Sequence, residues 1–110
     1  MKAYDQIRVR TAVITDTFLG IESNILTFLL QLRYNDESGQ GAGRYRLDGH
    51  STAFIRAILE IVGVKSWEEL KGKRVRVKAS FSKVTAIGSI SQKKKWLDFA
   101  DIANKCWLGK

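Results

Sequence analysis

One short segment of the sequence has the composition of a phosphate-binding loop. Residues 38–49 read SGQGAGRYRLDG and contain four of the nine glycines of the chain. A dinucleotide site needs G-x-G-x-x-G leading into a helix, and a P-loop needs Gly-Lys-Ser/Thr after its glycines. Here Gly39, Gly41 and Gly43 alternate and lead into RYRLD, whose own alternation predicts a strand. We therefore interpret residues 35–43, NDESGQGAG, as a flexible hairpin connection.

The residues that follow resemble a nucleophile elbow. Residues 49–53, GHSTA, lie between a predicted strand and a predicted helix, as the G-x-S-x-G motif of α/β-hydrolases does. That chemistry needs a separate histidine to accept the serine proton, but His50 is the only histidine and directly precedes Ser51. We interpret Ser51 as a helix cap. With Cys106 as the only cysteine, no metal-ligand cluster is evident, so we expect no metal, no cofactor and no enzymatic activity.

The charge of the chain is strongly asymmetric. Residues 1–70 hold eight Lys/Arg and nine Asp/Glu, whereas residues 71–110 hold eleven Lys/Arg and two Asp, which together give the net charge of +8. A basic half of this kind indicates a polyanionic or acidic partner, although solubility alone also explains many basic domains.

The basic residues recur at alternate positions of predicted strands, which would place them in outward-facing rows. Cations beside an aromatic ring suit nucleic acid, because phosphates need charge and bases need a stacking surface. Outward Lys and Arg also protect sheet edges from aggregation, so this pattern alone does not separate the two roles. The candidate residues for binding nucleic acid or another partner are Arg8, Arg10, Arg44, Arg46, Arg74, Arg76, Lys78, Lys93, Lys94, Lys95 and Trp96.

Hydrophobic periodicity predicts the elements that carry these residues. We expect strands at 7–15, 25–34, 44–48, 74–78 and 83–90, a helix at 51–62 that ends at Gly63, and a capped turn at 66–70. Residues 93–99 are either a final strand or the entry to a short helix. The predicted fold is α+β, a single domain over residues 1–110 with a mostly antiparallel sheet of about five strands and one main helix packed on one face.

Two strands have an expected orientation. In the first, Ile7, Val9, Thr11 and Val13 should face the core and Arg8 and Arg10 the solvent. The second, 25–34, is apolar on both faces and is therefore expected to be central and covered on each side. No apolar run is long enough to span a membrane or to form the core of a signal peptide, so we expect a cytoplasmic protein without membrane contact.

Three stretches together resemble a known group of sequences. GQGAGRYRLDG, FIRAILEIVGVKSWEELKGKRVRVKA, and AIGSI followed by KKKWLDF occur in the order seen in a family of small uncharacterised proteins encoded by phages and prophages. The resemblance covers most of residues 11–99 and implies no known activity. It implies a small protein that acts by stoichiometric binding in a host bacterial cytoplasm.

The leading hypothesis is a non-catalytic, basic binding protein of phage type that engages nucleic acid or a nucleoprotein. The alternative is a stoichiometric inhibitor of a host defence complex, as an anti-CRISPR protein is, which acts through protein–protein contact. An enzyme is a distant third.

Overall fold

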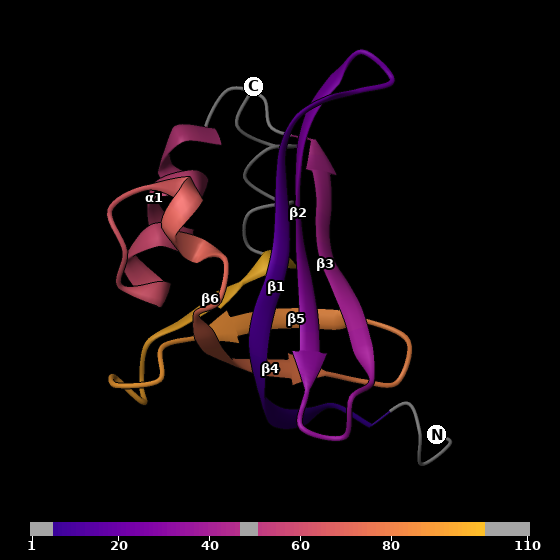
Figure 1. Cartoon of the computed structure of the whole chain (residues 1–110), viewed down its shortest axis with the longest axis vertical. Helices are drawn as coiled ribbons and strands as arrows, with labels where there is room; N and C mark the ends of the chain where they lie inside the picture. Colours follow the sequence, from indigo (N-terminus) through magenta and orange to yellow (C-terminus); the bar gives the residue numbers. More distant parts are fainter. Residues whose placement is uncertain (1–5, 47–50, 101–110) are drawn as a thin grey trace.

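The computed structural model describes residues 6–46 and 51–100, which form one antiparallel sheet and one main helix (Figure 1). The predicted α+β class is confirmed, with six strands where about five were expected. The elements are β1 (Arg8–Glu22), β2 (Ile25–Tyr34), β3 (Gly39–Arg46), α1 (Ser51–Val62), the 3-10 turn η2 (Trp67–Leu70), β4 (Arg74–Ala79), β5 (Val84–Gly88) and β6 (Trp96–Asp98).

The sheet curls because its longest strand pairs with two partners. Residues 8–13 of β1 pair with β4, while residues 12–22 pair with β2, and the order across the sheet is β3-β2-β1-β4-β5-β6. A register shift between Ile14 and Asp16 marks a bulge, which bends β1. As a result β4 and β5 run across the direction of β1, β2 and β3 (Figure 1), and β3 comes into contact with β5. The sheet is a partly open barrel.

The core fills the inside of this barrel. The buried apolar side chains of β2 are Phe28, Leu30, Leu32 and Tyr34, which lie on one face of the strand. Its other face is only partly covered, since Gln31 and Arg33 are exposed, so the expectation of cover on both sides was wrong. The reason is position: β2 has only β3 between it and the edge of the sheet.

The expectation of which β1 side chains face the core was wrong. Ala12 and Ile14 are buried, with exposures of 1% and 0%, whereas Ile7 and Val9 are 51% and 58% exposed. Arg8 and Arg10 therefore share the inner row with Ala12 and Ile14, because side chains alternate along the strand. Cations can occupy this row because β1 begins at the open end of the barrel, where the inner row meets solvent.

Helix α1 covers the other end of the barrel, and the predicted bounds are confirmed. Phe54 and Ile58 are buried, and the Phe54 ring meets the Phe28 ring edge-on at a centroid distance of 4.9 Å. Gly63 ends the helix with a φ of 86°, and its N–H and that of Val64 both donate to the Leu59 carbonyl. This is the left-handed helix end that favours glycine.

Gly39, Gly41 and Gly43 occupy a strand rather than the connection, so that prediction was wrong. The turn is formed by residues 35–38, in which the Asp36 carboxylate accepts hydrogen bonds from the backbone and hydroxyl of Ser38. Gly39 begins β3, and Gly43 adopts a φ of 127°. A Cβ at Gly43 would lie 2.6 Å from the Phe28 carbonyl oxygen and 2.9 Å from the Phe28 ring, so only glycine fits there.

The remaining predicted elements are present. Val75 and Val77 face the core from β4, and β5 pairs with β4 as a hairpin partner. Residues 96–98 form a strand on β5, and Phe99 and Ala100 are helical, so both readings of residues 93–99 are met in part. In the turn before η2 the Glu69 carboxylate accepts hydrogen bonds from the Lys65 N–H and the Ser66 hydroxyl.

Candidate nucleic-acid interface

The open end of the barrel forms a pocket of about 490 Å³, which we call the mouth. It lies where β1 and β3 begin and where β2 and β4 end, so segments far apart in the sequence converge on it. The lining residues that matter most are Arg8, Arg10, Tyr34, Gln40, Ala79 and Phe81.

Arg10 is held on one wall of the mouth by two contacts. Its guanidinium carbon lies 3.7 Å from the centroid of the Tyr34 ring, a cation–π distance. Its Nη2 lies 3.2 Å from Oδ2 of Asp36. The Ser38 hydroxyl and backbone N–H, followed by Arg10, hold the pKa of the Asp36 carboxyl below its usual value. Asp36 is therefore an anion at neutral pH and a partner that Arg10 can exchange for another anion.

Tyr34 and Gln40 connect the walls of the mouth. Burial raises the pKa of the Tyr34 phenol, so the group stays protonated, and its O–H donates a hydrogen bond to Oε1 of Gln40. The Gln40 amide nitrogen in turn donates to the carbonyls of Ser80 and Phe81 at 3.1 and 3.0 Å. These bonds tie β2 and β3 to the β4–β5 connection and fix the width of the mouth.

Arg8 and Phe81 stand at the rim. The Phe81 side chain is 78% exposed, and Arg8 is exposed at the start of β1. Among residues 6–46 and 51–100, no carboxylate lies within ion-pair distance of Arg8. The rim thus holds one exposed cation and one aromatic ring that is largely exposed.

The predicted rows of cations do not form one continuous face. In the β1–β4 register, Arg10 is opposite Val77 and Thr11 is opposite Arg76. Paired residues share a face, so Arg8 and Arg10 point into the mouth while Arg74, Arg76 and Lys78 lie on the outer face. Arg44 and Arg46 belong to β3 by their backbone, but their side chains fall outside the described residues.

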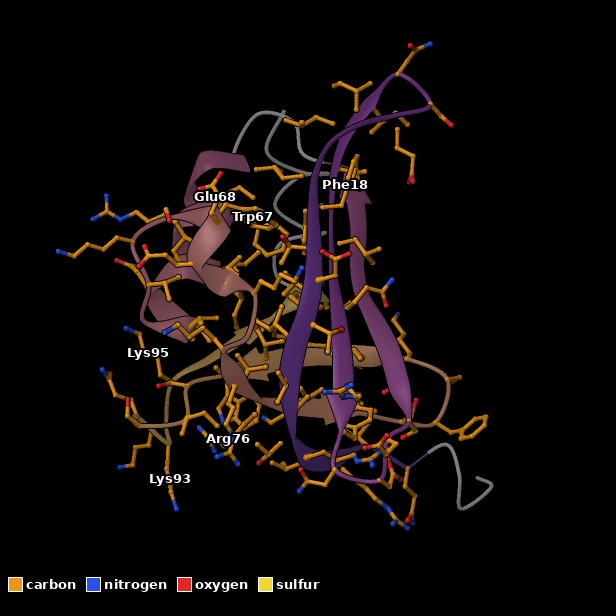
Figure 2. All side chains as sticks on the ribbon, in the orientation of Figure 1. Phe18, Trp67, Glu68, Arg76, Lys93 and Lys95 are labelled. Carbon is orange, nitrogen blue, oxygen red and sulfur yellow. The ribbon has the colours of Figure 1, made fainter. Side chains whose placement is uncertain are left out.

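Arg76 anchors the β5–β6 connection. Its Nε donates to the Ser89 carbonyl at 2.7 Å and its Nη2 to the Lys93 carbonyl at 2.6 Å, with a longer contact of 3.4 Å to the Gln92 carbonyl. The Lys95 N–H closes the turn on the Gln92 carbonyl at 2.9 Å. Residues 92–95 therefore form a fixed turn, from which Lys93 and Lys95 project outward beside Arg76 (Figure 2).

Trp96 packs on the sheet instead of offering a free ring. A Cβ at Gly88 would lie 2.7 Å from the Trp96 ring, so the indole rests directly on Gly88. The Arg76 guanidinium and the Lys78 ammonium lie 4.5 and 4.4 Å from the ring centroid. These contacts occupy the surface that a base would need for stacking.

Sequence reasoning missed three residues of the mouth: Tyr34, Gln40 and Phe81. One signal for Phe81 was present, since a phenylalanine between two serines in a short connection cannot easily reach a core. Tyr34 and Gln40 gave no such signal, because their roles depend on pairing between β2 and β3.

Comparisons with known proteins add no relative: no family model, no curated protein and no solved structure matches the chain. Within the described ranges, no group of three or more His, Cys, Asp or Glu side chains is placed to hold a metal ion. No helix in that part of the chain is long and apolar enough to span a membrane.

Proposed function

We propose that this protein is a non-catalytic binding module for single-stranded nucleic acid and that the strand enters at the barrel mouth. The observation that carries the proposal is the composition of the mouth, where Arg8 and Arg10 face a pocket whose rim holds the exposed Phe81 ring. Guanidinium groups bind phosphate, and an aromatic ring stacks on any base.

The size of the mouth favours an unpaired strand over a duplex. A pocket of about 490 Å³ is in the range of sites for single small ligands. Duplex readers place a protruding helix or ribbon in a groove, whereas Arg10 lies on an inner wall. A base that is not paired can enter such a recess while its phosphate stays at the rim.

The architecture supports the same proposal by analogy. The strand order β3-β2-β1-β4-β5, with a helix between the third and fourth strands, is that of OB-fold barrels. Many of these barrels bind oligonucleotides. The analogy concerns topology alone, and the specific assignment of residues rests on the mouth.

Each residue of the mouth has a distinct role in this proposal. Arg8 supplies a cation at the rim, and Arg10 exchanges Asp36 for a phosphate. That exchange costs little free energy, because the Arg10 and Asp36 side chains are 38% and 64% exposed and solvent screens exposed ion pairs. Phe81 stacks on the base. Tyr34 and Gln40 hold the walls in place.

The test is fluorescence anisotropy with labelled oligothymidylate and oligouridylate hexamers at several salt concentrations. Phe81→Ala should weaken binding about 5- to 150-fold, because stacking of one base is worth about 1–3 kcal/mol. Arg8→Gln should weaken binding and lower the slope of log K against log salt by about 0.7. Arg56→Gln is the control, since it removes the same charge from an 80% exposed position on α1.

Two results would contradict the proposal. One is the absence of hexamer binding by the wild-type protein at low salt. The other is hexamer binding that Phe81→Ala and Arg8→Gln change no more than Arg56→Gln does.

The β1–β2 hairpin favours a second candidate, a stoichiometric inhibitor of a host defence complex. This hairpin projects beyond the barrel (Figure 1) and exposes several apolar side chains, which are Phe18, Leu19, Ile21, Ile25 and Leu26. Exposed apolar patches of this kind often bind proteins. This candidate predicts that Ile21→Ser with Leu26→Ser, a directly paired couple, abolishes inhibition of a purified defence nucleoprotein, while Phe81→Ala leaves it unchanged.

A further inference from the structure

A row of cations leads away from the mouth along the outer face of the barrel. Lys78 precedes Ala79, which lines the mouth, and Arg76 is its neighbour on the same face of β4. Arg76 holds the turn that carries Lys93, Lys94 and Lys95. We call the five cations Arg76, Lys78, Lys93, Lys94 and Lys95 the basic belt.

The belt is continuous with the mouth. Lys78 pairs with Val9, whose chain neighbours Arg8 and Arg10 line the mouth on the inner side. Arg76 lies three residues before Ala79 on β4, which is a distance of about 10 Å along the strand. A chain of phosphates that leaves the mouth over the β1–β4 rim therefore meets Lys78, then Arg76, then the lysine turn.

The geometry of the turn favours an anion at its surface. The backbone of residues 92–95 is fixed by Arg76 and by two hydrogen bonds to Ser89. The Gln92 N–H donates to the Ser89 hydroxyl, and the Ser89 N–H donates to the Lys95 carbonyl. Its three lysines are exposed and adjacent in sequence, so this one turn carries three positive charges. On the same face, Asp98 lies two strands from Lys78, and its carboxylate accepts a hydrogen bond from the Ala100 N–H.

We propose that the basic belt is a second contact surface for the same single strand, one that binds phosphates without reading sequence. This inference rests on the proposed function of the mouth. The belt supplies charge and no stacking, because Trp96 is covered by Gly88, Arg76 and Lys78. Phosphate contacts position a strand, whereas base contacts specify it. Long strands should therefore use the belt and short strands should not.

The test compares a hexamer with a hexadecamer of oligothymidylate, lengths that span the site sizes of single OB-type barrels. The variant Lys93→Gln/Lys94→Gln/Lys95→Gln should bind the hexadecamer at least tenfold more weakly than wild type. Its slope of log K against log salt should fall by about 2, which is 0.7 for each of three phosphate contacts. Hexamer affinity should change less than threefold.

The matched control is Lys65→Gln/Lys71→Gln/Lys73→Gln, which removes the same charge from exposed positions in the α1–β4 connection. It should leave the hexadecamer within threefold of wild type. Thermal unfolding of both triple variants checks that the fold is intact, as expected for exposed side chains.

The outcomes separate the belt from the mouth. Equal losses for the two triple variants, or equal losses for the two oligonucleotides, would overturn the belt, because the lysines would then act only through net charge. If wild type binds neither oligonucleotide at low salt, the proposed function fails and the belt fails with it. A belt loss confined to the hexadecamer, together with the Phe81→Ala effect on the hexamer, supports both.

Discussion

Substitution of Gly43 by alanine tests whether the glycines of residues 38–49 serve packing or phosphate binding. Gly43 has a φ of 127°, and a Cβ there would lie 2.6 Å from the Phe28 carbonyl oxygen and 2.9 Å from Cε2 of its ring. Gly63 is a matched control: its φ is 86°, but a Cβ there would meet nothing within 4 Å. Both substitutions strain the backbone, and only that of Gly43 also forces an overlap.

The two costs can be separated. Backbone strain at a positive φ costs about 1–3 kcal/mol, and overpacking a filled site costs about 1–3 kcal/mol more. We expect Gly43→Ala to lower the free energy of unfolding by about 4 kcal/mol and Gly63→Ala to lower it by about 1 kcal/mol. The first loss is a large part of the roughly 5–15 kcal/mol that stabilises a typical domain.

Urea denaturation followed by circular dichroism measures both values, with unchanged m-values as the check on two-state unfolding. If the two substitutions lower the free energy of unfolding by amounts that differ by less than about 1 kcal/mol, the packing role of Gly43 is refuted. Normal stability of Gly43→Ala together with lost hexamer binding would instead indicate that the glycine segment binds phosphate.

Three further predictions test other parts of the structure. Arg76→Ala should lower the free energy of unfolding by about 2 kcal/mol, because it removes charge-assisted hydrogen bonds to backbone carbonyls; no measurable loss in urea would contradict the anchoring role. Ile14→Ala should lower the free energy of unfolding by about 3 kcal/mol and Val9→Ala by less than about 0.5 kcal/mol, since the two side chains are 0% and 58% exposed. A larger loss for Val9→Ala would mean that Val9, and not Ile14, faces the core. Ser38→Ala should raise the pKa of the Asp36 carboxyl toward its usual value in a carbon-13 NMR titration. Because the folded pKa of Asp36 is lowered, its contribution to stability is present above pH 4 or so and is lost as the pH falls through the folded pKa; an Asp36 pKa unmoved by Ser38→Ala would contradict this.

Local periodicity predicted most of the elements correctly. The helix at 51–62 was predicted with its bounds, because an apolar stripe at helical spacing and a following glycine are both local signals. The strand at 25–34 was also predicted with its bounds, from an apolar segment of strand length. The glycine segment was misread, since alternate glycines in a strand look like a flexible connection until the groups that crowd them are known. These are the Leu32 carbonyl at Gly39, the Leu29 side chain at Gly41 and the Phe28 ring at Gly43.

Only part of the candidate site could be predicted from the sequence. The excess of positive charge after residue 70 and the alternation of arginines are visible in the letters alone. The face on which each arginine lies is not. Arg8 and Arg10 look the same as Arg74 and Arg76 in sequence, yet the first pair lines the mouth and the second lies on the outer face.

The sequence by itself determined the α+β class, the positions of most of the elements and the basic character of the second half, because periodicity, capping and charge are properties of neighbouring residues. Only the tertiary structure decided the register of β1, since a bulge and two pairing partners set which residues face inward. It also assembled the mouth, where Gln40 bonds to carbonyls 40 and 41 residues away. Contacts over such separations depend on how the sheet curls, which no local pattern encodes.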